Sequence, residues 1–108
     1  MTKRQSSLTA KAALDLHHLP LDAKSLFEGL ILANLMAEKG YLSTTDSGEI
    51  KSYLVFTEAG LEYGKNAFNP FHDFKTDPKF YNDKFAKAYI LSLRALLEHG
   101  LAKFGDIS

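Results

Sequence analysis

The stretch that decides the fold reads LDAKSLFEGLILANLMAEKG at residues 21–40, then YLSTTDSGEIKSYLVF at 41–56, then TEAGLEYGKN at 57–66. Asp22 is a good N-cap residue, and the apolar residues after it recur at helical spacing. Gly40 suits the C′ position of a helix. We therefore expect a helix from Asp22 to about Lys39. Because its polar strip is narrow, this helix should lie in the core or against a second surface.

Two strands separated by turn residues follow this helix. Tyr41–Ser43 begins the first strand, and Lys51–Phe56 is rich in residues that favour strands. Asp46–Gly48 between them has the composition of a turn. Because a two-stranded hairpin is not stable alone, it must pack on the helices. Thr57 is expected to cap a short helix that runs to about Lys65.

A short helix is expected before this stretch. Thr9 is a suitable N-cap, and the alanine-rich sequence after it favours a helix. This helix should end near His17–His18, because Pro20 disfavours helical geometry at Leu19.

A long helix is expected at the C-terminal end. Asp77 and Pro78 are typical of a helix start, and Gly100 is typical of the residue after a helix end. The helix should run from Pro78 to about His99. Before it, residues 67–77 are too rich in phenylalanine for a solvated linker and are expected to form a loop strapped to the body.

The chain is expected to form one domain over residues 1–108, because its length leaves no room for two. Its core should span 8–66, followed by the aromatic loop 67–77 and the C-terminal helix 78–99. The predicted fold class is α+β, mainly α. A helix, a second helix and a two-stranded wing make a winged helix-turn-helix, to which a long C-terminal helix is added.

Composition restricts the function. The 13 basic and 13 acidic residues give a net charge of +0, whereas most nucleic-acid-binding domains have an excess of Lys and Arg. The absence of cysteine excludes disulfides and thiolate metal ligands. No apolar run approaches the ~20 residues of a membrane helix, and no secretory signal pattern is present. We expect a cytoplasmic protein with no membrane contact.

Three segments resemble a known family. TAKAALDL at 9–16, DAKSLFEGL at 22–30 with LMAEKGYL at 35–42, and FTEAGLEYGKN at 56–66 are similar to the small winged-helix modules of phage antirepressor-like and related bacterial regulators. KTDPKFYNDKF at 75–85 also looks like the material that follows the closing motif in such proteins. The resemblance implies a phage- or mobile-element-type transcription regulator that binds specific DNA sequences through its winged helix.

Seven residues are candidates for contact with DNA in this interpretation. The second helix would enter the major groove by its first turn, while the first helix and the wing would touch the backbone. The candidates are Lys11, Lys24, Ser25, Ser43, Thr44, Thr45 and Lys51.

The alternative function is a protein–protein interaction module on the same scaffold, with DNA binding lost. Glu28 on the outward strip of the second helix would repel phosphates, and outward leucines suit a protein partner. A host or phage protein would then bind at Leu32 and Leu35 and at the C-terminal helix, where Tyr89 and Leu93 are candidates. The same helix is predicted to pair two copies as a homodimer, since twofold pairing is the commonest oligomer.

Enzyme chemistry and cofactors are not expected. His17, His18 and Asp22 lie close in sequence, but no fourth ligand follows at the spacing of a zinc site. No Ser/His/Asp arrangement, glycine-rich phosphate loop or dinucleotide fingerprint is present. The sequence therefore predicts a binding protein without catalytic residues, metal or cofactor.

Overall fold

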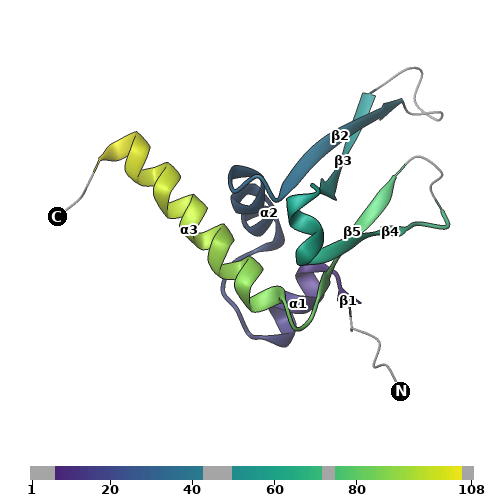
Figure 1. The fold of residues 1–108 in the computed structure, drawn as a ribbon, viewed down its shortest axis with the longest axis horizontal. Helices are drawn as coiled ribbons and strands as arrows, with labels where there is room; N and C mark the ends of the chain where they lie inside the picture. The colour runs from purple at the N-terminus through teal and green to yellow at the C-terminus, as the bar shows by residue number, and fades with distance from the viewer. Residues whose placement is uncertain (1–6, 43–49, 72–74, 106–108) are drawn as a thin grey trace.

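The computed structural model describes residues 7–42, 50–71 and 75–105. Helices, strands and one 3-10 helix follow one another along the chain (Figure 1). They are β1 (Ser7–Leu8), α1 (Ala10–Leu16), α2 (Ala23–Leu32), β2 (Met36–Leu42), β3 (Ile50–Phe56), the 3-10 helix η1 (Ala59–Glu62), β4 (Gly64–Phe68), β5 (Thr76–Tyr81) and α3 (Phe85–Phe104).

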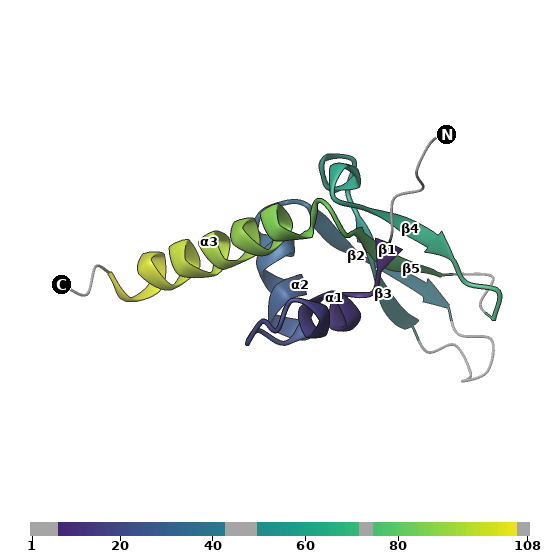
Figure 2. The same ribbon diagram turned by 90° about the horizontal axis from the view of Figure 1, so that it is seen from below.

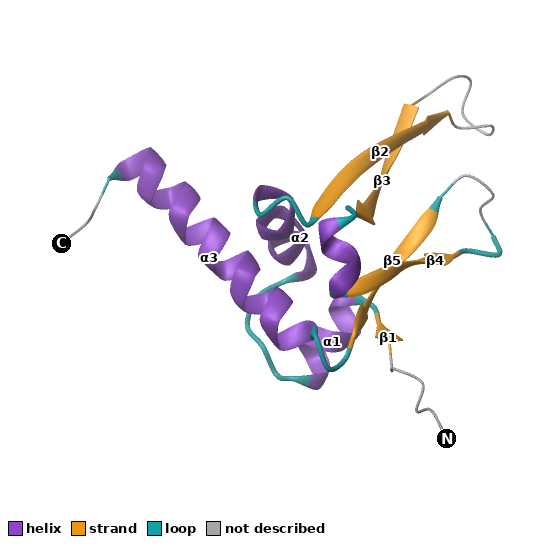
Figure 3. Ribbon diagram, viewed as in Figure 1, coloured by secondary structure: helices purple, strands orange, loops and turns teal. Residues whose placement is uncertain are grey.

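The strands form two separate antiparallel sheets. One is the hairpin of β2 and β3, and the other has the order β1-β5-β4. The short β1 pairs only with Phe80 and Tyr81 of β5, so the chain closes its second sheet with a strand from the N-terminal end. Helices α1, α2 and α3 gather on one side of the molecule, and the two hairpins extend on the other (Figures 2 and 3).

The core is built around Phe80, which joins the sheets to the helices. Its ring meets Phe56 of β3 and Phe85 of α3 edge to face, with centroids 5.1 Å and 5.3 Å apart. Phe27 of α2 stacks against it at 6.3 Å. Edge-to-face and offset contacts are the favoured geometries of aromatic pairs. Both sheets and two helices thus share one aromatic centre.

Helices α2 and α3 cross closely at two small residues. Ser92 is fully buried, and its hydroxyl donates a 2.8 Å hydrogen bond to the carbonyl of Leu26. A Cβ atom added to Gly29 would overlap both the side chain and the backbone of Ser92. The sequence therefore needs a glycine on the inner face of α2 for α3 to reach its observed position.

Asn66 connects the two sheets. Its Oδ1 accepts a 2.8 Å hydrogen bond from the N–H of Phe56, and its Nδ2 donates to the carbonyl of Phe56 at 3.3 Å. The side-chain amide of β4 therefore satisfies the outward backbone groups of β3, much as a neighbouring strand would.

The N-caps predicted for the first two helices are confirmed. The Thr9 hydroxyl accepts a hydrogen bond from the N–H of Ala12, and Asp22 Oδ1 accepts one of 2.7 Å from the N–H of Ser25. The first helix ends at Leu16, close to the predicted position.

The predicted end of the second helix is wrong. The helix stops at Leu32, and Asn34 takes a left-handed conformation with φ of 62°. Asn is one of the few residues other than Gly that adopt this conformation readily. The hairpin therefore begins at Met36 rather than at Tyr41.

The region after the first hairpin differs most from the prediction. The expected helix from Thr57 to Lys65 is a four-residue 3-10 helix, and strands of a second hairpin take up both ends of the predicted loop 67–77. The C-terminal helix begins at Phe85 and continues through Gly100 to Phe104.

The predicted mainly α winged helix-turn-helix is therefore wrong. Over the described residues the molecule is an α+β fold, in which three α-helices accompany five antiparallel strands in two sheets. The physical cause is long-range pairing of β5 with both β1 and β4, which occupies the residues assigned to a loop and a helix start.

Candidate ligand-binding cleft

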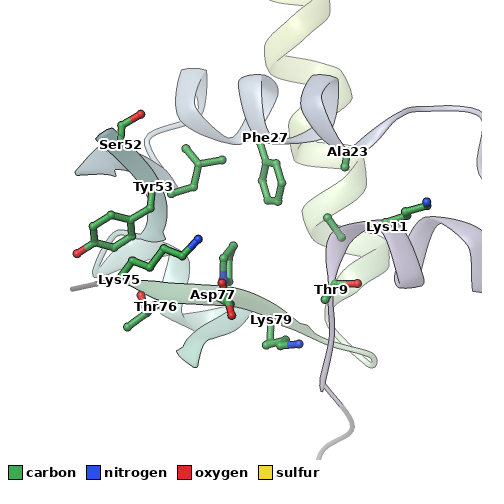
Figure 4. Close-up of a pocket in the computed structure, with 13 residues that line it drawn as sticks. Thr9, Lys11, Ala23, Phe27, Ser52, Tyr53, Lys75, Thr76, Asp77 and Lys79 are labelled. Atoms are coloured by element: carbon green, nitrogen blue, oxygen red, sulfur yellow. The ribbon is translucent and has the colours of Figure 1, made fainter. Parts of the chain in front are cut away.

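A cleft of about 630 Å³ lies where β3 approaches β5, beside the first turns of α1 and α2. Figure 4 shows the side chains around it. Its lining is mixed, with apolar, hydroxyl and charged residues. The lining residues are Thr9, Ala10, Lys11, Ala23, Phe27, Ser52, Tyr53, Leu54, Lys75, Thr76, Asp77, Pro78 and Lys79.

The length of β1 leaves this part of β5 open. Because β1 covers only Phe80 and Tyr81, no strand of the described residues pairs with the preceding part of β5 on that side. The N–H of Tyr81 bonds to the carbonyl of Tyr63, the residue before β4, so by alternation the backbone groups of Pro78 and Thr76 face the open edge. Pro78 has no N–H to leave unpaired there. Pro78 therefore suits an open edge, because it removes one of the backbone donors that would otherwise lack a strand partner there.

The cleft has a positive charge excess. Three lysines line it, Lys11, Lys75 and Lys79, against one carboxylate, Asp77, which leaves two positive charges in excess. In Figure 4 the amine of Lys75 lies toward the open space, and the ring of Phe27 projects into it from α2. A flat apolar surface beside ammonium groups suits a ligand that has both a ring and a negative charge.

One polar atom of the cleft residues has an unusual environment. Thr76 Oγ1 is buried and has no hydrogen-bond partner among the described residues. A buried hydroxyl without a partner is destabilising, and such atoms are rare in proteins. This atom is a candidate for a hydrogen bond with a ligand.

Aromatic residues continue beyond the cleft on the first hairpin. Tyr53 lines the cleft and meets Tyr41 of β2 edge to face, with centroids 5.7 Å apart. The cleft therefore opens beside an aromatic pair on the surface of β2 and β3.

Only part of the predicted DNA-binding set lies in the described residues. Lys11 lines the cleft, but Lys24 lies at a separate hollow beside Glu28 and Glu38. The Ser25 backbone N–H is used by the cap of α2. Lys51 lies in β3, and Ser43, Thr44 and Thr45 lie outside the described residues.

The predicted protein-contact residues differ in how far they are exposed. Leu32 and Leu93 are exposed, at 43% and 36%. Leu35 is half-buried, and its carbonyl accepts a hydrogen bond from the N–H of Thr57. Tyr89 is buried in the core, since it belongs to the face of α3 that packs on the body.

The two histidines of the first turn have structural contacts. The ring of His17 stacks on Phe85 at 5.8 Å, and its Nε2 lies 3.3 Å from Asn82 Oδ1. His18 has a positive φ of 53° in the turn. Within residues 7–42, 50–71 and 75–105, no group of three His, Cys, Asp or Glu side chains is placed to hold a metal ion.

Sequence reasoning missed Lys75, Thr76 and Lys79. They were assigned to a loop and to the start of the last helix, because Asp77–Pro78 is typical of a helix N-terminus. The signal that pointed elsewhere is the alternation of Thr76, Pro78 and Phe80 with charged residues, which is the spacing of a strand.

The fold and the cleft define a small α+β domain with a positively charged, partly aromatic cleft between two hairpins. Comparisons with protein-family models, curated proteins and solved structures find no match for this chain. No helix in the described part of the chain is both long and apolar enough to cross a membrane.

Proposed function

We propose that this chain binds nucleic acid at the cleft between its two hairpins, with one unpaired nucleotide of a DNA strand held there. The observation that carries the proposal is the amine of Lys75 facing the same open space as the ring of Phe27, in a cleft that Lys11 and Lys79 also line. Phosphates are neutralised by lysines, and bases stack on aromatic side chains.

The size and lining of the cleft favour a single strand over a duplex. A cleft of about 630 Å³ is within the usual range for one small ligand, whereas a duplex is read in its grooves by a protruding element. The buried hydroxyl of Thr76 supports the proposal, because it can donate a hydrogen bond to a phosphate or a base.

An added peptide strand fits this edge less well. Peptides that extend a sheet use a continuous row of backbone donors and acceptors. Pro78 interrupts the donors of β5 where it lines the cleft.

The regulatory role and the sequence specificity implied by the resemblance stay predictions. They assumed that α2 enters the major groove, but Lys24 at its start lies beside Glu28 and Glu38. Carboxylates at this position weaken contact with phosphates. The proposal therefore concerns binding of a DNA strand at the cleft, and no process is assigned to it.

The test is fluorescence anisotropy with a labelled single-stranded DNA, and with RNA and duplex DNA of the same sequence. If three lysines neutralise phosphates, log K should fall with log salt at a slope of about −2. The double variant Lys75→Gln/Lys79→Gln should reduce the slope to about −0.7.

The matched control is Lys103→Gln, which removes one exposed charge at the far end of α3. It should bind like the unmodified chain. Failure of single-stranded DNA to bind at about 50 mM salt would overturn the proposal, since counterion release favours binding there. Equal affinity of the double variant and the unmodified chain would move the site elsewhere.

A second function, binding of another protein, is favoured by a separate observation. Helix α3 has a row of exposed apolar side chains that no described element covers.

A further inference from the structure

Helix α3 carries two apolar faces, and only one of them packs on the body. Phe85, Ala88, Tyr89 and Ser92 are buried against the rest of the molecule. At about 100° per residue, a second row lies roughly a quarter to a third of a turn away on the helix. It contains Ile90, Leu93, Leu97, Leu101 and Phe104, which are exposed at 51%, 36%, 62%, 41% and 76%. We call this row the outer stripe.

The C-terminal half of α3 extends beyond the other elements in both views (Figures 1 and 2). A lone helix with exposed leucines is unfavourable in water, and its apolar face needs a partner to be stable. The outer stripe is therefore the largest exposed apolar surface on any helix of the described chain.

Four residues of the outer stripe, together with Ala86 and Gly100, have the spacing of a coiled-coil seam. Ala86, Ile90, Leu93, Leu97, Gly100 and Phe104 follow one another at alternating intervals of four and three residues. This alternation keeps one row of side chains facing a partner helix.

We propose that the outer stripe binds the outer stripe of a second copy of the chain, with the two α3 helices antiparallel. In an antiparallel pair centred on the level of Ala95, Leu93 of one copy meets Leu97 of the other. Ile90 meets Gly100, and Phe104 meets Ala86. Each of these pairs is centred on the same residue, so one twofold axis produces all of them.

The pairing matches large side chains with small ones. Gly100 leaves room for Ile90, because a Cβ atom added to Gly100 would have no neighbour within 4 Å. Ala86 lies at a hollow of about 350 Å³ that is also lined by His17, Leu19, Phe85, Tyr89 and Ile90. Phe104, which is 76% exposed, would enter the hollow of the other copy. Large residues that fill spaces beside small ones give the close packing of a stable helix pair.

A parallel pair fits less well. It would bring Gly100 against Gly100 and Ala86 against Ala86, which leaves voids, and Phe104 against Phe104. The antiparallel pair also brings Glu98 of each copy to within about one turn of Arg94 of the other, on one flank of the seam. Arg94 of the two copies also lie near each other on that flank, so the packing of large against small side chains, rather than charge, favours this orientation.

The apolar area of the outer stripe sets the affinity expected for the dimer. Five partly exposed apolar side chains make a patch on the order of a few hundred Å², whereas a standard stable interface buries about 800 Å² from each partner. The dimer should therefore be weak and concentration-dependent, with a Kd on the order of micromolar.

The first test is sedimentation equilibrium of the full chain over a range of concentrations. A monomer–dimer equilibrium is expected, and Leu97→Glu should shift it to monomer by at least tenfold in Kd. Leu61→Glu is the matched control, because Leu61 is 47% exposed on η1 and lies outside the outer stripe. Circular dichroism on both variants checks that the fold is kept.

The register is tested with disulfides, since the chain has no cysteine of its own. Ile90→Cys mixed with Gly100→Cys should form a mixed disulfide under mild oxidation. Neither variant alone should do so, because equal positions lie about 15 Å apart along the antiparallel helices.

Homodisulfides in each single variant would show a parallel pair and overturn the proposal. A chain that stays monomeric at high concentration would also overturn it, and would leave a different protein as the partner of this face. Because both experiments use only the protein, their outcome does not depend on whether DNA binds at the cleft.

Discussion

At the scale of single residues, a substitution at Thr76 tests whether its hydroxyl binds a ligand or stabilises the fold. Its buried hydroxyl has no partner among the described residues, so replacing it with a methyl group removes a desolvation cost of about 1–3 kcal/mol. Thr76→Val keeps the branched shape and should raise the Tm. If the hydroxyl bonds to DNA, the same variant should weaken oligonucleotide binding several-fold in the anisotropy assay.

Thr9→Val is the matched control, because the hydroxyl that it removes does have a hydrogen-bond partner in the folded chain. The Thr9 hydroxyl accepts the N–H of Ala12 as the cap of α1, so its loss should lower stability by about 1 kcal/mol. A lower Tm for both variants would show that Thr76 has a structural partner and would remove it from the proposed site.

Asn66 gives a second prediction at this scale. Its amide both donates to and accepts from the backbone of Phe56. Asn66→Asp keeps an acceptor but places a carboxylate against the Phe56 carbonyl, so chemical denaturation at neutral pH should show a loss of about 1–3 kcal/mol. The loss should shrink at low pH, where a protonated carboxyl can donate again.

Asn69→Asp is the matched control for this prediction. The Asn69 oxygen accepts the N–H of Phe71 at 2.9 Å, and aspartate can accept the same bond. An equal loss in both variants would mean that charge, rather than the lost donor, causes the effect. The role of Asn66 was not predictable from the sequence, because its partner lies ten residues away on another strand.

At the scale of elements, the start of α2 responds to pH. Hydrogen bonds from the side chain and the backbone N–H of Ser25 lower the pKa of Asp22, and Lys24 adds to this effect. A carboxyl whose pKa is lower in the folded state contributes stability above its unfolded pKa of about 4. That stability is lost as the pH falls through the folded pKa.

Asp22→Asn tests this contribution, because asparagine keeps the capping oxygen without a titrating charge. The Tm of the unmodified chain should fall relative to that of Asp22→Asn as the pH decreases from neutral to below about 4. Curves that stay parallel over this range would show that the charge of Asp22 contributes nothing to α2.

The starts of the first two helices were predictable from the sequence, but the end of α2 and the start of α3 were not. The caps at Thr9 and Asp22 are local signals, and the structure uses both. The end of α2 depends on Asn34 taking a left-handed conformation, which its residue type permits but does not require. Pro78 is compatible both with a helix start and with an open strand edge. The local sequence therefore did not show whether Asp77 and Pro78 begin a helix or belong to a strand.

At the scale of the whole molecule, the fold depends on pairings between distant segments. Ser7 and Leu8 pair with Tyr81 and Phe80, across most of the chain. Such pairing leaves no periodic signal in β1, because a strand of two residues is too short to alternate. The cleft follows from the same pairing, since a longer β1 would cover the edge of β5. Sequence reasoning therefore found Lys11 but neither the neighbours that make it part of a site nor the site itself.

If both proposals hold, a dimer carries two clefts that are related by a twofold axis. The length of the DNA strand should then decide how tightly the dimer binds it. A short oligonucleotide fills one cleft, so Leu97→Glu, which separates the copies, should leave its affinity unchanged. A strand several times longer can occupy both clefts, and the second contact then gains from a high effective concentration. Leu97→Glu should weaken binding of the long strand about tenfold or more in the anisotropy assay, while Leu61→Glu should not. Equal loss for short and long strands would place α3 at the DNA contact itself, and no loss for either would show that the two surfaces act independently.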